Sequence, residues 1–259
     1  MIRGLYTTAS AVRAQEIRLG MLMNNLANVN TTGFKGDKVA YHGFQKMAIS
    51  RLMSASTDFP LEEELGPLPV STAAVLSTGA PAIDLMDGPL IETERTLDIA
   101  LRGPGFLVVQ TADGERYTRN GSLRIDADGL LTLADGSPVL GVDGPVRIEE
   151  NHPDALRIEA DGSIFVGNQQ IARLRLVEIA PEGLRKVGDT YFEATDAGFV
   201  REAQGTTVSQ GFLEGSNVDA TSTMVELLSL VRSYTVSLEY LRLQDEALGR
   251  AVGEIARFA

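Results

Sequence analysis

The segment from Met224 to Ile255 reads MVELLSLVRSYTVSLEYLRLQDEALGRAVGEI, and its apolar residues decide the fold class of the chain. They recur at alternating spacings of three and four residues over more than four heptads, and only Asp245 departs from the apolar pattern. A repeat of this length is typical of a coiled-coil helix rather than of a surface helix on a globular domain. Its members are Met224, Leu227, Val231, Tyr234, Leu238, Leu241, Asp245, Leu248, Val252 and Ile255.

A matching repeat lies near the other end of the chain and predicts a helix from about Ile2 to Ala27. Its members are Ile2, Leu5, Ala9, Val12, Glu16, Leu19, Met23 and Leu26. The two helices can pair with each other, with copies in other subunits, or both. Their regularity favours a helical stalk, and the alternative is that both helices pack onto the central region as ordinary amphipathic elements.

Two acidic residues, Glu16 and Asp245, interrupt these repeats. A charge in a helical seam lowers stability unless it is paired or solvated. Partners could come from four arginines, or solvent could satisfy both carboxylates; the arginines are Arg13, Arg18, Arg232 and Arg242.

Composition excludes several classes of protein. The 259 residues carry a net charge of −12, which argues against binding to nucleic acid and against an electrostatic membrane anchor. The chain has no cysteine, so neither a disulfide framework nor a thiolate metal site is expected. Apolar runs are too short for a membrane span, and the N-terminal segment does not resemble a cleaved secretory signal.

Turn-forming residues follow the first predicted helix. The stretch from Asn28 to Gly33 disfavours helix, and Gly33 can take the left-handed conformation that closes one. A second helix is expected over Val39–Met53. Pro60, Gly66, Pro67 and Pro69 then predict a linker or extended arm over Ser54–Thr72.

From Ala73 onward, short aliphatic runs alternate with turns. Asp-Gly pairs between apolar runs are a strong hairpin signal, and six begin at Asp87, Asp113, Asp128, Asp135, Asp143 and Asp161. The chain therefore predicts an antiparallel β domain, with inward-facing core residues Leu101, Phe106, Val108, Ile125, Leu131, Leu174 and Leu176. Its candidate strands are Leu97–Leu101, Phe106–Gln110, Arg116–Arg119, Ser122–Asp126, Leu130–Leu133, Pro138–Leu140, Val146–Glu149, Leu156–Glu159, Ser163–Val166, Ile171–Ile179, Tyr191–Glu193 and Phe199–Arg201.

The sequence thus predicts an α+β chain, in which N- and C-terminal helices pair as a coiled-coil stalk beside a central antiparallel β-rich domain. Residues 1–53 form the N-terminal helical part of the stalk and residues 54–72 form the linker or extended arm. Residues 73–211 form the central β domain, and residues 212–259 form the C-terminal coiled-coil helix. Ser216 to Asp219 offer helix N-cap residues just before that last helix.

No catalytic, cofactor-binding or metal-binding site is predicted. The two histidines, His42 and His152, lack partners at any triad or zinc spacing. The run Asp126-Ala127-Asp128-Gly129 fits a turn better than a calcium loop, because its glycine comes too early. Gly103-Pro104-Gly105 precedes a predicted strand rather than a helix, so it is interpreted as a bend and not as a phosphate-binding loop.

Several motifs resemble those of the bacterial flagellar basal-body rod and hook proteins. The run from Asn24 to Lys35, NNLANVNTTGFK, is similar to the N-terminal motif of that family, as is Gly4 to Thr7. The segments Leu97–Val109 and Tyr117–Ser122 resemble the core of its β domain, and Leu213–Asp219 resembles the opening of its C-terminal helix. Gly103-Pro104-Gly105 departs from the family, in which Gly-Asp-Gly is usual.

The resemblance implies a structural, non-enzymatic subunit of the rod, which self-assembles into a helical axial structure and transmits torque from motor to hook. Proximal rod type is slightly favoured over distal rod type. Implied partners are copies of the chain, other rod and hook axial proteins, and the flagellar type III export apparatus, with no nucleic acid and no membrane insertion. The implied location is the basal body, reached across the cytoplasmic membrane without a cleaved signal.

The assembly interface is expected to combine the helical repeats with motif residues between them. Its members are Ile2, Leu5, Val12, Leu19, Met23, Leu26, Asn28, Gly33, Phe34, Asn217, Asp219, Leu227, Val231, Tyr234, Leu238, Leu241, Leu248, Val252 and Ile255. Two alternatives stay open at this point: a non-flagellar β-domain adaptor or adhesin on a coiled-coil stalk, and a carboxylate-based glycosidase in the β domain.

Overall fold

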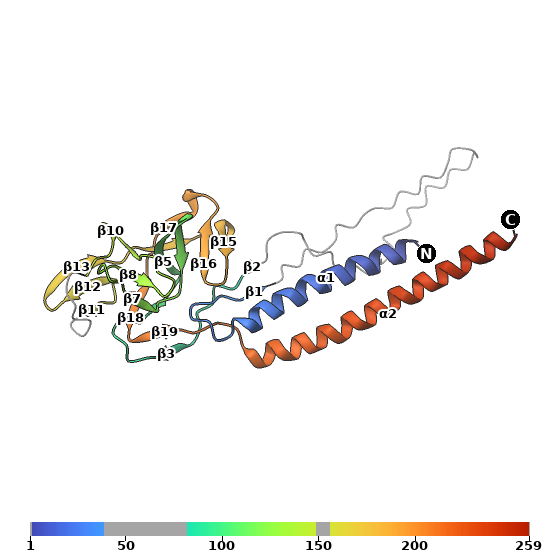
Figure 1. The fold of residues 1–259 in the computed structure, drawn as a ribbon, viewed down its shortest axis with the longest axis horizontal. Coiled ribbons are helices and arrows are strands. Elements are labelled where there is room, and N and C mark those ends of the chain that lie inside the picture. The colour runs from blue at the N-terminus through green and yellow to red at the C-terminus, as the bar shows by residue number, and fades with distance from the viewer. Residues whose placement is uncertain (1, 39–81, 149–155, 259) are drawn as a thin grey trace, which may run out of the picture. The chain divides into compact units, whose positions relative to one another are not determined.

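The computed structural model describes residues 2–38, 82–148 and 156–258 (Figure 1). Two long helices lie at the ends of this range: α1 (Ile2–Ala27) and α2 (Ala220–Phe258). These bounds confirm both predicted terminal helices. The helix expected over Val39–Met53 and the linker at Ser54–Thr72 lie outside the described residues. None of the helices in the described ranges is long and apolar enough to cross a membrane.

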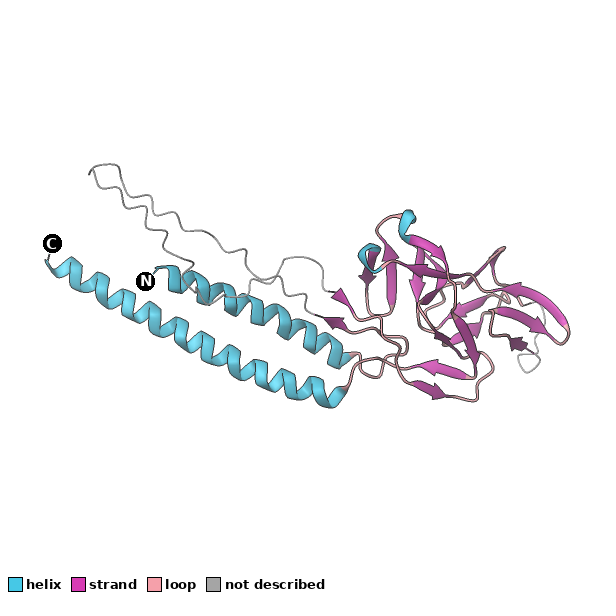
Figure 2. Cartoon of the chain, turned by 180° about the vertical axis from the view of Figure 1, so that it is seen from behind, coloured by secondary structure: helices cyan, strands magenta, loops and turns pink. Residues whose placement is uncertain are grey.

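The chain divides into two compact units. Within the described ranges, the first comprises residues 2–20 and 228–258, and the second comprises residues 21–38, 82–148 and 156–227. Within the first unit, α1 and α2 run antiparallel and side by side (Figure 1, Figure 2). Gln15 Nε2 of α1 donates a hydrogen bond to Ser233 Oγ of α2, at 3.1 Å.

Helix α2 begins at an N-cap that the sequence predicts. Asp219 Oδ2 accepts from the Ser222 backbone N–H at 2.9 Å, and its other oxygen accepts from the Thr221 N–H at 3.3 Å. These bonds satisfy amide groups that have no partner inside the helix. Hydrogen bonding by the Ser222 side chain, followed by the backbone N–H groups of Ser222 and Thr221, lowers the pKa of the Asp219 carboxyl group.

The second unit is built from short antiparallel strands. The strands are β1 (Asp37–Lys38), β2 (Ala82–Ile83), β3 (Leu90–Glu92), β4 (Ile99–Arg102), β5 (Gly105–Thr111), β6 (Gly114–Thr118), β7 (Leu123–Ile125), β8 (Leu131–Leu133), β9 (Leu140–Gly141), β10 (Gly144–Pro145), β11 (Leu156–Ile158), β12 (Ser163–Val166), β13 (Gln169–Arg173), β14 (Leu176–Ile179), β15 (Leu184–Val187), β16 (Tyr191–Ala194), β17 (Val200–Glu202), β18 (Thr207–Gln210) and β19 (Phe212–Glu214). The largest sheet has six strands in the order β15-β16-β6-β5-β14-β17.

Five of the six Asp-Gly pairs form turns between strands, as predicted, but Asp87-Gly88 does not, because β2 and β3 on either side of it pair with β1 and β19 and not with each other. The turn at Asp113-Gly114 joins β5 to β6, and the turn at Asp128-Gly129 joins β7 to β8. Gly114, Gly129, Gly136, Gly144 and Gly162 have positive φ angles, which a residue without a Cβ adopts at low cost. Gly103 has a φ of +100° between β4 and β5, which confirms the predicted bend.

Strand β5 packs apolar side chains on both of its faces. Leu107 and Val109 belong to one buried cluster, whereas Phe106 and Val108 belong to a second cluster with Phe192. The prediction placed only Phe106 and Val108 inside, although an unbroken apolar run is typical of a strand that is covered on both faces. Most predicted core residues are buried, while Ile125 and Leu176 are partly buried.

Three strand predictions need correction. The single strand expected over Ile171–Ile179 is in fact two strands, β13 and β14. The break between them includes Leu174, which forms an isolated bridge to Gly141. Of the strand expected at Val146–Glu149, residues 146–148 form only one bridge, between Arg147 and Leu130, and Glu149 lies outside the described residues. No strand was expected after Arg201, yet β18 and β19 form there and pair with β4 and β3, so residues 212–214 of the range assigned to the C-terminal helix are a strand and α2 begins only at Ala220.

Candidate functional site

Three of the sequence motifs meet inside the second unit. The segment after α1 supplies Lys35, the end of β6 is followed by Arg119, and β19 supplies Glu214. With Asp87, which follows β2, these residues form what we call the ion cluster. Lys35, Arg119 and Glu214 are buried to 1% exposure or less, and only Asp87 reaches solvent.

Glu214 stands at the centre of the ion cluster. Its Oε1 lies 2.6 Å from Lys35 Nζ and 3.0 Å from the Gly88 backbone N, and its Oε2 lies 3.3 Å from Arg119 Nη1. Arg119 Nη1 also bonds Asp87 Oδ1 at 3.1 Å. Two cations therefore face two carboxylates, so each buried charge has a partner of opposite sign. Hydrogen bonds between charged groups are stronger than those between neutral groups, which stabilises this arrangement.

Burial lowers the pKa of the Lys35 ammonium below its ordinary value, while the nearby Glu214 carboxylate acts in the opposite direction. Lys35 Nζ also donates to the Met86 carbonyl oxygen at 2.6 Å. The cluster thus ties the chain after α1 to both β19 and the segment after β2.

Phe34 is fully buried beside this cluster. Lys186 Nζ lies 3.8 Å from the centroid of the Phe34 ring, a cation–π contact. The same ammonium donates to the Lys35 carbonyl oxygen at 2.9 Å and pairs with Asp37 at 3.3 Å. Burial lowers the pKa of Lys186, and Asp37 opposes that effect.

Asparagine side chains fix the backbone between α1 and β1. Asn25 of α1 exchanges two hydrogen bonds with the backbone of Asp37, each of 2.9 Å. Asn217 Oδ1 accepts from the Gly36 N–H at 2.8 Å, and Asn217 Nδ2 donates to the Asp84 carbonyl oxygen at 2.8 Å. Side-chain amides here replace the backbone partners that irregular segments lack.

Gly33 has a different role from the predicted one. Helix α1 ends at Ala27, so Gly33, with a φ of +69°, does not close it. A Cβ on Gly33 would lie 2.5 Å from the backbone of both Arg119 and Asn120, and the Gly33 N–H donates to the Glu214 carbonyl oxygen at 2.8 Å. Glycine permits this close approach of three backbone segments.

Replacing Gly33 by alanine is expected to lower the free energy of unfolding by about 2–4 kcal/mol, because a left-handed φ costs about 1–2 kcal/mol and the clash adds to it. Gly136→Ala is the matched control, since Gly136 has a φ of +88° but open space around its Cβ position. Urea unfolding of both variants measures the difference. Equal losses would show that the close approach to Arg119 does not exist in solution.

The structure distributes the predicted interface residues over three environments. Asn28, Gly33 and Phe34 are buried within the second unit, Asn217 is held by the contacts above, and Asp219 is the exposed N-cap. Val12, Leu19, Leu26, Leu227, Tyr234, Leu238, Leu241 and Leu248 are half-buried, whereas Met23 and Val231 are exposed. Ile2, Leu5, Val252 and Ile255 lie in α1 or α2, but their side chains are outside the described part of the structure.

Along α2, the covered face is rotated from the predicted seam. Leu227, Tyr234, Leu238, Leu241 and Leu248 are shared, but Thr223, Leu230 and Gln244 are covered in place of Met224, Val231 and Asp245, and Ser237 is covered beside Leu238. Thr223, Ser237 and Gln244 are polar, so a prediction based on the spacing of apolar residues does not include them. Glu16 and Asp245 are both exposed in the single chain, which leaves their carboxylates solvated.

The ion cluster was not predicted from sequence. Its residues are separated by up to 179 positions, and no local pattern links them. One signal was available: Lys35, Arg119 and Glu214 each lie inside a motif that resembles the rod and hook family. Among the described residues, no three His, Asp or Glu side chains are grouped as metal ligands would be; His42 and His152 lie outside that range.

The ion cluster pairs its own buried charges and joins segments that are distant in the sequence, an arrangement typical of a structural element. Family models match three parts of the chain: a flagella basal body rod protein model at residues 5–35, a flagellar hook protein FlgE/F/G D1 domain model at 100–166, and a flagellar basal body rod FlgEFG C-terminal model at 209–253.

Curated relatives match almost the whole chain. The flagellar basal-body rod protein FlgF of Escherichia coli is 30% identical, over 97% of each chain. FlgG of Bacillus subtilis and FlgG of Borreliella burgdorferi are each 30% identical, over 97% of this chain and 98% of the relative. The chain therefore belongs to the flagellar basal-body rod protein family and is a structural subunit of the rod. Equal identity to FlgF and FlgG does not separate the rod types, and the matches do not favour an adaptor or adhesin.

Proposed function

We propose that α1 and α2 pair as a coiled-coil stalk and that this stalk carries assembly of the chain into a helical axial structure. That structure transmits torque from the motor to the hook. Copies of this chain and other rod and hook axial proteins are the neighbours, and the subunit has no enzymatic role. It reaches the basal body through the flagellar type III export apparatus without a cleaved signal.

The observation that carries the proposal is a row of exposed apolar side chains on α2. Met224, Leu228 and Val231 follow one another at spacings of four and three residues, and each is exposed in the single chain. Leu243 is also exposed, but twelve residues after Val231 it lies roughly 120° away around the helix axis, on another face. A soluble helix normally turns charged residues to solvent, so an apolar stripe of this kind indicates an interface with another chain.

The two faces of α2 then have different tasks. The face with Leu230, Tyr234 and Leu241 is covered within the chain, and the adjacent face with Met224, Leu228 and Val231 is available for neighbouring subunits. The predicted seam overlaps both faces. A helix that contacts one partner within its chain and others between chains needs apolar residues over a wider arc than a two-stranded coil.

The test is to express an epitope-tagged chain in cells that lack the native one and to image isolated basal bodies. We expect the tag at the rod and restored motility. A chain lacking residues 228–258 should accumulate without being incorporated. If the full-length chain is absent from basal bodies and forms a defined soluble oligomer, the adaptor alternative replaces this proposal.

A further inference from the structure

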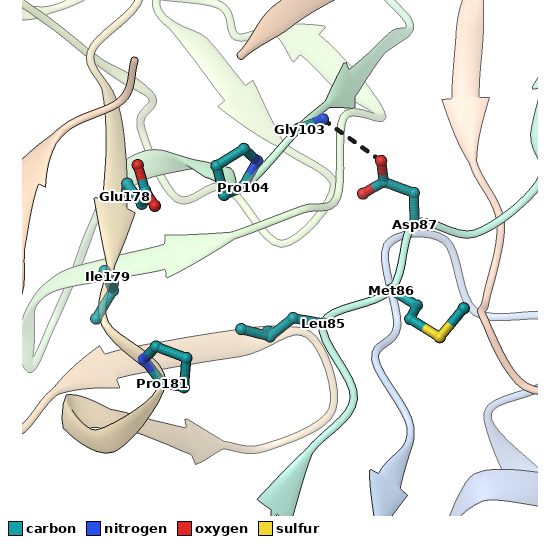
Figure 3. A pocket seen from close by; sticks show the side chains of 8 residues that line it. All are labelled: Leu85, Met86, Asp87, Gly103, Pro104, Glu178, Ile179 and Pro181. Carbon is teal, nitrogen blue, oxygen red and sulfur yellow. Dashed lines mark hydrogen bonds between the residues drawn. The ribbon is translucent and has the colours of Figure 1, made fainter. Parts of the chain in front are cut away.

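A pocket of about 320 Å³ opens on the second unit, and all of its lining belongs to that unit (Figure 3). Its apolar walls come from Leu85, Pro104, Ile179 and Pro181. Asp87 and Glu178 add a carboxylate each, from different segments of the chain. A volume of this size is near the lower limit for small-molecule sites and suits a single side chain better.

The two carboxylates differ in their own partners. Asp87 bonds Arg119 at 3.1 Å and also accepts from the Gly103 N–H at 3.4 Å (Figure 3). The Glu178 side chain has no hydrogen bond or ion pair within the described ranges of the chain, although its backbone belongs to the β14 ladder. Arg201 stands opposite Glu178 in the β14–β17 register, yet the two side chains form no ion pair. Glu178 is therefore the uncompensated charge of the pocket.

We infer that this pocket receives an arginine or lysine side chain from a neighbouring copy of this chain, an inference that rests on the proposed assembly function. A long cationic side chain buries its methylene stem against apolar walls and places its charged end against a carboxylate. Met86, which is 68% exposed beside the pocket, supplies further apolar surface for the stem.

Charge complementarity points to a second copy as the occupant. Copies of a chain with a net charge of −12 repel each other, so a contact between them needs cations placed locally against carboxylates. In a helical polymer, a pocket on one subunit meets a different surface of the next. Arg102, Arg124 and Arg147 are exposed and form no ion pair within the described residues, so the chain itself offers the cation.

The first experiment uses the absence of native cysteine. In isolated basal bodies containing Glu178→Cys, a benzophenone-maleimide label is photoactivated, and cross-linked peptides are identified by mass spectrometry. We expect dimer-sized products that join position 178 to a peptide with an exposed arginine of another copy. Glu182→Cys, on the exposed surface outside the pocket, is the matched control and should give few such products. Products confined to one copy, products with another protein, or no products at all would overturn the inference.

The second experiment is competition for incorporation between co-expressed wild-type and variant chains. Glu178→Gln is expected to be incorporated about tenfold less than wild type, on the order of the effect of losing one interfacial charge pair. Arg201→Ala should match wild type. Equal losses for both variants would mean that Glu178 serves Arg201 in its own chain and would overturn the inference. Failure of the wild-type chain itself to enter basal bodies would instead contradict the proposed function.

Discussion

Glu214→Gln is expected to lower the free energy of unfolding of the second unit by about 3–5 kcal/mol, the usual cost of removing one partner from a buried ion pair. The substitution leaves Lys35 and Arg119 buried, with the half-exposed Asp87 as the remaining carboxylate. It also weakens the bond from the Gly88 N–H. Urea unfolding at neutral pH, followed by circular dichroism of the β signal, measures the loss.

Glu159→Gln is the matched control, because the Arg157–Glu159 pair lies in solvent with both side chains about half exposed. Exposed pairs contribute about 0–1 kcal/mol, so this variant should stay close to wild type. A double-mutant cycle with Lys35→Met should show a coupling energy above about 1 kcal/mol with Glu214. If Glu214→Gln unfolds like Glu159→Gln, the ion cluster is open to water in solution.

Val231→Asp is expected to abolish incorporation into basal bodies while leaving the isolated chain folded. Val231 is 39% exposed in the single chain, so an aspartate there stays hydrated until a neighbouring subunit covers it. Burying that charge without a partner costs about 3 kcal/mol or more, which lowers subunit affinity at least about a hundredfold. The loss recurs at every subunit of the polymer, so elongation should stop. Motility and rod content of isolated basal bodies measure the effect.

The adjacent residue gives the contrasting variant. Leu230 is 8% exposed, so Leu230→Asp should first destabilise the isolated helical unit, which circular dichroism detects as lost helix. Leu238→Asp, half-buried on the predicted seam, should also prevent elongation, whereas the exposed Arg242→Ala should be mild. Normal assembly of both Val231→Asp and Leu238→Asp would mean that α2 does not form the subunit interface.

The sequence by itself determined the features that depend on local rules. Alternating spacings of three and four residues located α1 and α2, Asp219 marked the start of α2, and Asp-Gly pairs marked the turns of the β-rich unit. These features were predictable because helix periodicity, N-capping and positive-φ turns depend on residues within a few positions of one another. The resemblance to the rod and hook family could also be recognised from sequence, because its motifs are short runs of consecutive residues.

Only the tertiary structure decided which of these residues meet. The ion cluster joins Lys35, Arg119 and Glu214 across most of the chain, and β18 and β19 find their partners more than a hundred positions earlier, at β4 and β3. The covered face of α2 was likewise decided by long-range packing, which covers Leu230 and Gln244 in place of the predicted seam residues Val231 and Asp245. Long-range pairing and burial are collective, because each contact depends on how all the other segments pack, and no local pattern encodes that result.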